Sequence, residues 1–150
     1  MFRLNKLSDY AAVLMACLAE DGERVSAQAL AERARLELPT VAKLLKQLSS
    51  AGLVNATRGT TGGYVLARAA DHISVADIVI AIEGPMGLTE CSVHQGGCSR
   101  ESFCAISSNL RKISMAVEHA LRSVTLADLS APPKNWRPRV SIERTLEIAQ

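Results

Sequence analysis

Three of the chain's four cysteines fall within fourteen positions, in the segment "CSVHQGGCSRESFC". Cys91, Cys98 and Cys104 are spaced C-x6-C-x5-C, and Gly96 and Gly97 give the backbone between them conformational freedom. Three soft thiolates on a segment that can wrap around a metal suit an iron-sulfur cluster or zinc. Zinc knuckles usually contain two ligands separated by two to four residues. Because this segment has no such pair, its spacing favours a cluster.

The rest of the chain indicates the compartment in which these thiols would work. No stretch approaches the roughly 18 uninterrupted apolar residues of a membrane span, and the first residues lack a signal-peptide cleavage site. We therefore expect a cytoplasmic protein, where clustered cysteines are more often metal ligands or redox centres than disulfides. The segment has no C-x-x-C pair and no acid-base constellation nearby, so we expect neither catalysis nor a small-molecule substrate. Cys17, on an apolar helix face, is expected to act as a small hydrophobe.

The composition predicts the kind of fold that positions the cysteines. A chain of 150 residues suits one compact domain with one further long helix. Apolar residues make up 48% of it and aromatic residues only 3%, which suits Ala-, Leu-, Val- and Ile-rich helices better than a β-sandwich. We therefore expect a mainly α fold.

Three helices are predicted before the middle of the chain. The first covers residues 9–18, with Ser8 or Asp9 as N-cap. Its apolar positions are Tyr10, Val13, Leu14, Cys17 and Leu18. Ser26 is expected to cap a second helix, with Leu30, Ala31 and Ala34 on its inner face. A third helix begins near Pro39 and ends at Gly52, and its apolar stripe is Val41, Leu44, Leu45 and Leu48.

Two β-prone pieces, "LVNATR" and "GYVLAR", follow the third helix and are joined by "GTTG", whose glycines suit a hairpin turn. Three helices followed by a hairpin is the order of a winged helix-turn-helix, in which the third helix enters the major groove and the hairpin reaches the flanking backbone. Residues 39–68 cover these two elements and contain four basic residues and no acidic one. We therefore expect them to contact double-stranded DNA.

The DNA contacts are divided by their expected role. The N-terminal residues of the third helix face base edges in this kind of docking, which selects Pro39, Thr40, Val41 and Lys43. Phosphate contacts are expected from Lys46, Arg58 and Arg68. Gly62, Gly63 and Tyr64 are expected at the wing tip, where glycine lets the backbone approach the minor groove.

A fourth helix and a long apolar stripe complete the pattern. Ser74 is expected to cap the fourth helix, whose buried side is Val75, Ile78, Val79 and Ile82. After the cysteines, apolar residues recur along about twenty positions, roughly 30 Å of helix, at Ile106, Leu110, Ile113, Val117, Leu121 and Val124. A wing module of this size cannot cover that stripe alone, so we expect a homodimer.

The chain thus divides into four expected parts. Residues 1–83 form the winged helix-turn-helix unit, 84–105 the cysteine loop, and 106–129 a long dimerisation helix. Residues 130–150 are polar and proline-broken at first, which predicts a mobile tail.

With these segments identified, the chain closely resembles the Rrf2 family of bacterial transcription regulators, whose best-known members sense iron-sulfur clusters or nitric oxide. The resemblance rests on "RLNKLSDYAAVLM", "LPTVAKLLKQLSSAGLV", "RGTTGGYVLAR", "ISVADIVIAIEGP" and the three-cysteine loop, and spans residues 2 to 128 or so. Within the family, "LSDYA" together with "IEGPMGLTECS" looks most like the branch that regulates the Suf-type iron-sulfur assembly operon.

The resemblance implies a [2Fe-2S] or [4Fe-4S] cluster on the three cysteines, and either commonly needs a fourth protein ligand. The family's iron-sulfur homeostasis member has a histidine three residues past the last cysteine, where this chain has Ser107. The nitric-oxide-sensing branch donates a carboxylate across the dimer from its "TDYA" motif, and the matching residue here is Asp9. If Asp9 is not a cluster ligand, its role would be that of an ordinary helix N-cap. His94 is the second candidate and Glu101 the third.

The resemblance therefore implies a DNA-binding repressor of iron-sulfur assembly genes whose operator binding depends on the cluster. In this hypothesis the cluster holds the loop, the dimer helix and the first helix in one arrangement. Two alternatives stay open: a nitric oxide- or redox-sensing regulator of the same family, and a DNA-binding protein stabilised by zinc.

Overall fold

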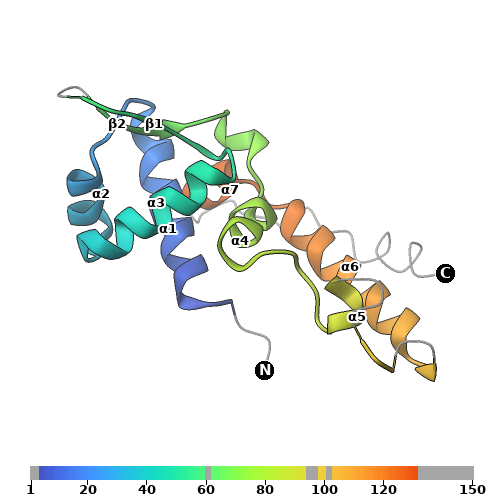
Figure 1. The fold of residues 1–150 in the computed structure, drawn as a ribbon. Helices are drawn as coiled ribbons and strands as arrows, with labels where there is room; N and C mark the ends of the chain where they lie inside the picture. Colours follow the sequence, from blue (N-terminus) through green and yellow to red (C-terminus); the bar gives the residue numbers. More distant parts are fainter. Residues whose placement is uncertain (1–3, 60–61, 94–97, 101–102, 132–150) are drawn as a thin grey trace.

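The computed structural model describes residues 4–59, 62–93, 98–100 and 103–131. In this part of the chain, helices pack around one core and carry a two-stranded sheet at one end, while α6 extends away from this unit (Figure 1). The mainly α, winged architecture predicted from the sequence is confirmed.

Helix α1 spans Lys6–Asp21 and begins earlier than predicted. Asn5 is its N-cap, because the Asn5 side chain accepts a hydrogen bond from the Leu7 amide at 3.1 Å. The predicted cap at Ser8 or Asp9 is therefore wrong. The buried face is also turned from the predicted one: Val13 is exposed, and the fully buried positions are Ala11, Leu14, Met15 and Leu18.

Helices α2 (Ala27–Ala34) and α3 (Leu38–Ser50) match the prediction closely. Ser26 caps α2 by accepting a hydrogen bond from the Ala29 amide at 3.1 Å. Pro39 lies in the first turn of α3, where a missing N–H leaves no helical bond unmade. All four residues of the predicted apolar stripe of α3 are fully buried: Val41, Leu44, Leu45 and Leu48.

The wing consists of β1 (Val54–Thr57) and β2 (Gly63–Leu66), which pair antiparallel from Val54↔Leu66 to Thr57↔Gly63. It is fastened to the preceding link through Tyr64 of β2, whose backbone exchanges hydrogen bonds of 2.9 and 2.8 Å with that of Val25. The wing is therefore attached to the link between α1 and α2 as well as to α3.

Helix α4 (Val75–Glu83) follows a single 3-10 turn, η1 (Ala70–His72). A capping box begins it, in which Ser74 accepts from the Asp77 amide and Asp77 accepts from the Ser74 amide. Gly84 ends it with a φ of 88°, a left-handed value that favours glycine. This confirms the predicted Ser74 cap and the predicted stop.

The long helix predicted over residues 106–129 is wrong in its extent. α6 spans Ser107–Arg122, and a separate helix, α7, spans Leu126–Ser130. Between them the chain pairs with the segment before α4: the Val75 amide donates to the Val124 carbonyl at 2.9 Å, and the Leu126 amide to the Ile73 carbonyl at 2.7 Å. Residues 124–130 therefore pack against the helical unit, and Leu126 among them is fully buried in its core.

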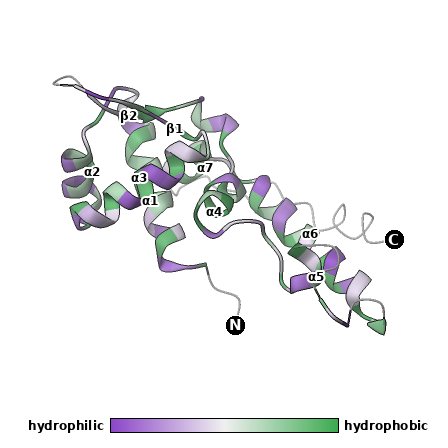
Figure 2. Cartoon of the chain, in the orientation of Figure 1, coloured by the Kyte–Doolittle hydropathy of each residue, from purple (hydrophilic) through white to green (hydrophobic). Residues whose placement is uncertain are grey.

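Helix α6 carries apolar side chains that are exposed in the described part of the chain. Figure 2 shows α4 as predominantly hydrophobic, whereas hydrophobic and hydrophilic residues alternate on α6. The exposed apolar side chains on and beside α6 are Phe103, Ile106, Ile113 and Met115. Among the described residues, no helix combines the length and the apolar character needed to cross a membrane.

Candidate metal centre and nucleic-acid interface

Cys91 lies on the short helix α5 (Glu90–Val93), which packs against α6. The residue is only 7% exposed, and its sulfur lies 3.2 Å from the hydroxyl oxygen of Thr89. That hydroxyl also lies 2.8 Å from the Ser92 hydroxyl, and the Ser92 amide donates to the Thr89 carbonyl at 2.9 Å. The first cysteine is therefore held in place by its neighbours before any metal binds.

The segment before Cys91 is fixed to α6 by Ser114. The Leu88 amide donates to the Ser114 hydroxyl at 3.0 Å, and this hydroxyl donates to the Leu110 carbonyl at 3.0 Å. Gly87 packs so tightly on α5 that an added Cβ would lie 2.4 Å from Cγ2 of Val93. The start of the cysteine loop is thus docked on the helix that follows the loop.

Cys98 and Cys104 are half-buried, and all three loop cysteines are free thiols. Cys104 leads into α6, because both the amide and the hydroxyl of Ser107 donate to the Cys104 carbonyl, at 3.3 and 3.1 Å. Ser107 therefore builds the start of this helix.

The described residues contain no group of three His, Cys, Asp or Glu side chains gathered closely enough to hold a metal ion. The two loop candidates for the fourth ligand, His94 and Glu101, lie outside those residues. The donor chemistry still fits a cluster, since three thiols share one loop and soft sulfur ligands are the ones that iron-sulfur clusters use. Binding would require the loop to bring Cys98 and Cys104 to the docked Cys91.

Asp9 lies in the first turn of α1 with its side chain exposed. Because Asn5 caps the helix, the alternative in which Asp9 serves only as the N-cap is excluded. The turn itself is held by Glu83 at the end of α4, whose carboxylate accepts hydrogen bonds from the Ser8 hydroxyl and from the Asn5 amide, the latter at 3.1 Å. Sequence reasoning missed this clamp because Ser8 and Glu83 lie 75 residues apart.

The predicted base-reading residues at the start of α3 do not all face outward. Pro39, Lys43 and also Lys46 are exposed and Thr40 is half-buried, as a recognition surface requires. Val41, by contrast, is fully buried in the core, so its prediction as a base contact is wrong. Val41 lies near the start of the helix, but the helical period places it on the same inner stripe as Leu44 and Leu48.

The three residues predicted at the wing tip lie in the hairpin turn or directly after it. Gly62 is in the turn, where its amide donates to the Gly59 carbonyl at 2.9 Å, and Arg58 is exposed beside it. Gly63 and Tyr64 are the first two residues of β2 and pair with Thr57 and Ala56, directly beside the turn. Gly63 is buried and packs against Val25. A Cβ at this position would lie 2.8 Å from the Val25 carbonyl oxygen, so the site has no room for a side chain.

Arg68 was expected to meet phosphate, but in this structure it forms an ion pair. Its Nη2 lies 3.1 Å from Oδ2 of Asp77, and Nη1 of Arg122 lies 3.3 Å from Oδ1 of the same carboxylate. Burial raises the pKa of Asp77, but hydrogen bonds from Ser74 and the charges of Arg68 and Arg122 outweigh it and lower that pKa below its usual value. Asp77 thus joins the end of the wing to the end of α6.

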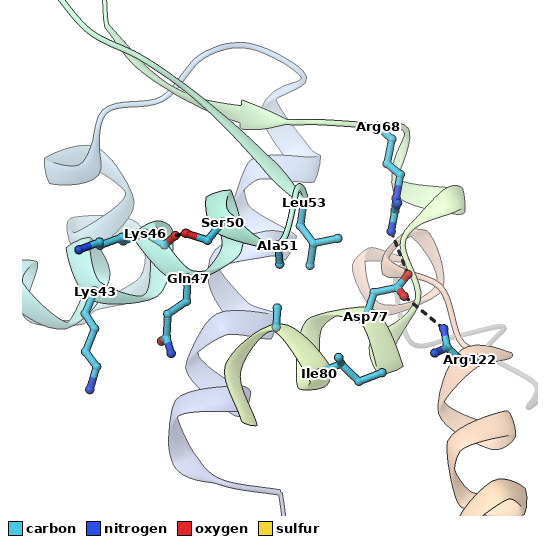
Figure 3. A pocket seen from close by; sticks show the side chains of 11 residues that line it. Lys43, Lys46, Gln47, Ser50, Ala51, Leu53, Arg68, Asp77, Ile80 and Arg122 are labelled. Atoms are coloured by element: carbon cyan, nitrogen blue, oxygen red, sulfur yellow. Dashed lines mark hydrogen bonds and ion pairs between the residues drawn. The ribbon is translucent and has the colours of Figure 1, made fainter. Parts of the chain in front are cut away.

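A groove of about 800 Å³ opens beside these residues (Figure 3). It is lined by Lys43, Lys46, Gln47, Ser50, Ala51, Leu53, Arg68, Asp77, Ile80, Ala81 and Arg122. Sequence reasoning missed Asp77 and Arg122. The "SVAD" capping-box pattern could have placed Asp77 in the first turn of α4, but nothing in the sequence indicated its two arginine partners.

Comparisons with known proteins agree on one family. A family model described as "Rrf2: Iron-dependent Transcriptional regulator" matches residues 4–132. Protein rrf2 of Nitratidesulfovibrio vulgaris is 32% identical over 139 residues, covering 89% of this chain and 93% of that protein. The HTH-type transcriptional regulator IscR of Klebsiella pneumoniae is 30% identical over 129 residues, covering 85% of this chain and 78% of that protein.

Solved structures give the same result. IscR of T. potens is similar with a TM-score of 0.67 at 29% identity, covering 91% of this chain and 93% of that chain. CymR, the global cysteine regulator of B. subtilis, is similar with a TM-score of 0.66 at 30% identity, covering 87% of this chain and 97% of that chain.

Proposed function

Because the chain belongs to the Rrf2 family of transcriptional regulators, DNA-binding proteins rather than enzymes, we propose that it is a cytoplasmic repressor of Suf-type iron-sulfur assembly genes. We propose further that a [2Fe-2S] or [4Fe-4S] cluster controls its affinity for the operator. The observation that carries this proposal is the position of the thiols relative to α6. α5, which holds Cys91, packs against α6, and Cys104 leads directly into the same helix.

In this proposal Cys91, Cys98 and Cys104 hold the cluster, and Asp9 of the partner subunit is the fourth ligand. The exposure of Asp9 and the cap at Asn5 support its role, since neither the core nor the helix start requires its carboxylate. His94 remains the second candidate. When bound, the cluster supplies metal-thiolate bonds that iron scarcity, oxygen or nitric oxide can break, and a carboxylate ligand makes one iron easier to attack.

The proposed DNA contacts are the exposed residues of α3 and the wing. Pro39, Thr40 and Lys43 would read bases, while Lys46, Arg58 and Gly62 would meet the backbone. A homodimer through α6 would present two copies of α3 to half-sites about 34 Å apart. Since both α3 helices must engage together, a change in the position of α6 that costs a few kcal/mol suffices to release the operator.

The test is anaerobic purification of the wild type and of Cys98→Ala, with Cys17→Ala as the matched control. The wild type and Cys17→Ala should be brown and contain iron and sulfide, whereas Cys98→Ala should lose the colour but keep its helical circular dichroism. Operator affinity of the wild type should change at least about tenfold between the loaded and emptied forms, which corresponds to about 1.4 kcal/mol. A colourless wild type that contains zinc, or equal affinity of both forms, would refute the proposal.

A thiol-based redox sensor is the second candidate, because Cys98 and Cys104 are partly accessible to solvent and neither is in a disulfide. CymR of Staphylococcus aureus, solved in an oxidized form, is similar with a TM-score of 0.66. If this candidate is correct, the protein should contain no iron, and mild peroxide should modify Cys98 or Cys104 and change operator affinity. Mass spectrometry of the peroxide-treated protein distinguishes the two candidates.

A further inference from the structure

The groove beside α3 is basic on both of its walls (Figure 3). Lys43 and Lys46 line it from α3, Arg68 from the end of the wing, and Arg122 from the last turn of α6. Two carboxylates oppose these four cations: Asp77 inside the groove, and Glu118, which lies 2.7 Å from Arg122 at its edge. Positive charge therefore remains in excess, which favours an anionic occupant.

The two arginines are oriented in advance by Asp77. Each guanidinium group gives one nitrogen to that carboxylate, at 3.1 and 3.3 Å, and the arginine side chains are still 45% and 48% exposed. A guanidinium group has five N–H donors. Arg68 directs one nitrogen to Asp77. Arg122 directs Nη1 to Asp77 and both Nε and Nη2 to Glu118, at 2.9 and 2.7 Å, so each arginine keeps donors for an anion. Because the side chains are already ordered, binding an anion costs less conformational entropy than it would on mobile arginines.

The groove also lies at the correct place for one of the two DNA strands. A helix in the major groove, which is about 12 Å wide, has a phosphate backbone on each side. In Figure 3 the wing strands rise above α3, whereas α4 and the end of α6 lie below and beside it. The groove lies along the flank of α3 that faces α4 and the end of α6, and the wing reaches it only at its root, through Leu53 and Arg68.

We propose that this groove seats the phosphate backbone of the operator, and that Arg122 of α6 contacts one phosphate. The inference rests on the proposed DNA-binding function and extends it, because it places the end of the cysteine-linked helix on the DNA itself. α6 begins three residues after Cys104 and ends at Arg122. Any displacement of α6 would then change the contact between Arg122 and the phosphate directly, without a change in the packing of the core.

The test is the salt dependence of operator binding by Arg122→Gln, Arg122→Lys and the control Lys112→Gln, which removes the same charge from α6 outside the groove. Each phosphate contact contributes about 0.9 to the slope of log affinity against log salt concentration. Arg122→Gln should therefore lower the slope by about one unit per subunit, while Arg122→Lys and Lys112→Gln should leave it close to that of the wild type. Thermal unfolding confirms that the variants compared are folded.

Phosphate-ethylation interference adds a positional readout. One phosphate in each half-site whose ethylation blocks binding of the wild type should no longer do so for Arg122→Gln. Interference at the same phosphates in both proteins would overturn the inference.

Further outcomes distinguish a failure of this inference from a failure of the proposed DNA-binding function on which it rests. If Arg58→Ala lowers the slope but Arg122→Gln behaves as Lys112→Gln does, the groove inference is wrong and the DNA-binding function stands. If the wild type binds no DNA, both are wrong. If pyrophosphate binds the free protein tightly and Arg122→Gln abolishes this without changing the slope, the groove serves a small anion, and the inference is overturned.

Discussion

At the scale of single residues, burial separates side chains that the sequence makes look alike. Val41 and Lys43 are two positions apart in α3, yet one is fully enclosed and the other is exposed. Cys91 is likewise enclosed beside Thr89, whereas Cys98 and Cys104 are half-open. The proposed centre therefore has one buried thiol and two that are partly accessible to solvent.

Asp77 provides a prediction at this scale. Its pKa is lowered in the folded protein, so its contribution to stability is present above the pKa of the unfolded chain, near 3.9, and is lost as the pH falls through the lower folded value. We expect Asp77→Asn to be less stable than the wild type at pH 7 by about 1 kcal/mol, a modest figure because the ion pairs are partly exposed. Urea unfolding between pH 7 and pH 2 should show this difference shrinking below pH 4.

Asp71→Asn is the matched control, since the Asp71 carboxylate is largely exposed and lies 3.9 Å from Nε2 of His72. Its stability curve should run parallel to that of the wild type above pH 5. A parallel curve for Asp77→Asn as well would mean that neither the hydrogen bonds from Ser74 nor the two arginines stabilise the charged form of Asp77 in the folded protein.

At the scale of elements, the end of α6 decides how the cysteine-linked helix communicates with the DNA-binding unit. The apolar periodicity continues through Val124, but the helix stops at Arg122, because Thr125 and Asp128 form a second capping box. The Thr125 hydroxyl accepts from the Asp128 amide at 3.1 Å, and Asp128 accepts from the Thr125 amide at 2.9 Å. The capping box and the burial of Leu126 thus separate α6 from α7, although the apolar periodicity continues past the end of α6.

The capping box provides a prediction at the scale of this element. Thr125→Ala removes the cap and should lower the free energy of unfolding by about 1 kcal/mol. Ser130→Ala, which removes only a hydroxyl bonded to the Leu126 carbonyl, should change it by less than about 0.5 kcal/mol. Guanidinium unfolding followed by circular dichroism measures both. Equal effects of the two substitutions would show that the box does not define the boundary between α6 and α7.

At the scale of the whole molecule, the exposed apolar residues of α6 indicate an interface with a second molecule. Ile106, the N-cap of α6, and Ile113, seven positions further on, lie on one side of the helix and are each at least half exposed, where the helix extends away from the core. Exposed apolar clusters of this kind mark interaction sites, and a second copy of the chain would cover the face symmetrically.

The dimer is tested by Ile113→Glu, which would place an unpaired charge in the interface. We expect its dimer dissociation constant to rise by about a hundredfold, or about 3 kcal/mol, with helical content unchanged. Lys112→Glu, at the neighbouring exposed position, should leave the constant within a few-fold. Sedimentation velocity over a range of concentrations measures both. A dimer of unchanged affinity in Ile113→Glu would locate the interface elsewhere.

Much of the fold could be predicted from local signals. Ser26 and Ser74 cap the helices assigned to them, the stripe of α3 is buried throughout, and Gly62 lies in the wing turn. The candidate site was less predictable. The cysteines are evident from their spacing, but the Glu83 clamp on α1 and the two arginines of Asp77 depend on residues far apart in the chain.

The sequence by itself determined the second, third and fourth helices, the hairpin, the family and the spacing of the thiols, because each depends on residue types and spacings within a short stretch of chain. Only the tertiary structure decided that Val41 faces inward, that Gly63 packs on Val25 and that α6 stops at Arg122. It also decided that residues 45 positions apart, Asp77 and Arg122, meet at the edge of a basic groove. These outcomes are set by which surfaces are buried together, and burial is a property of the packed chain.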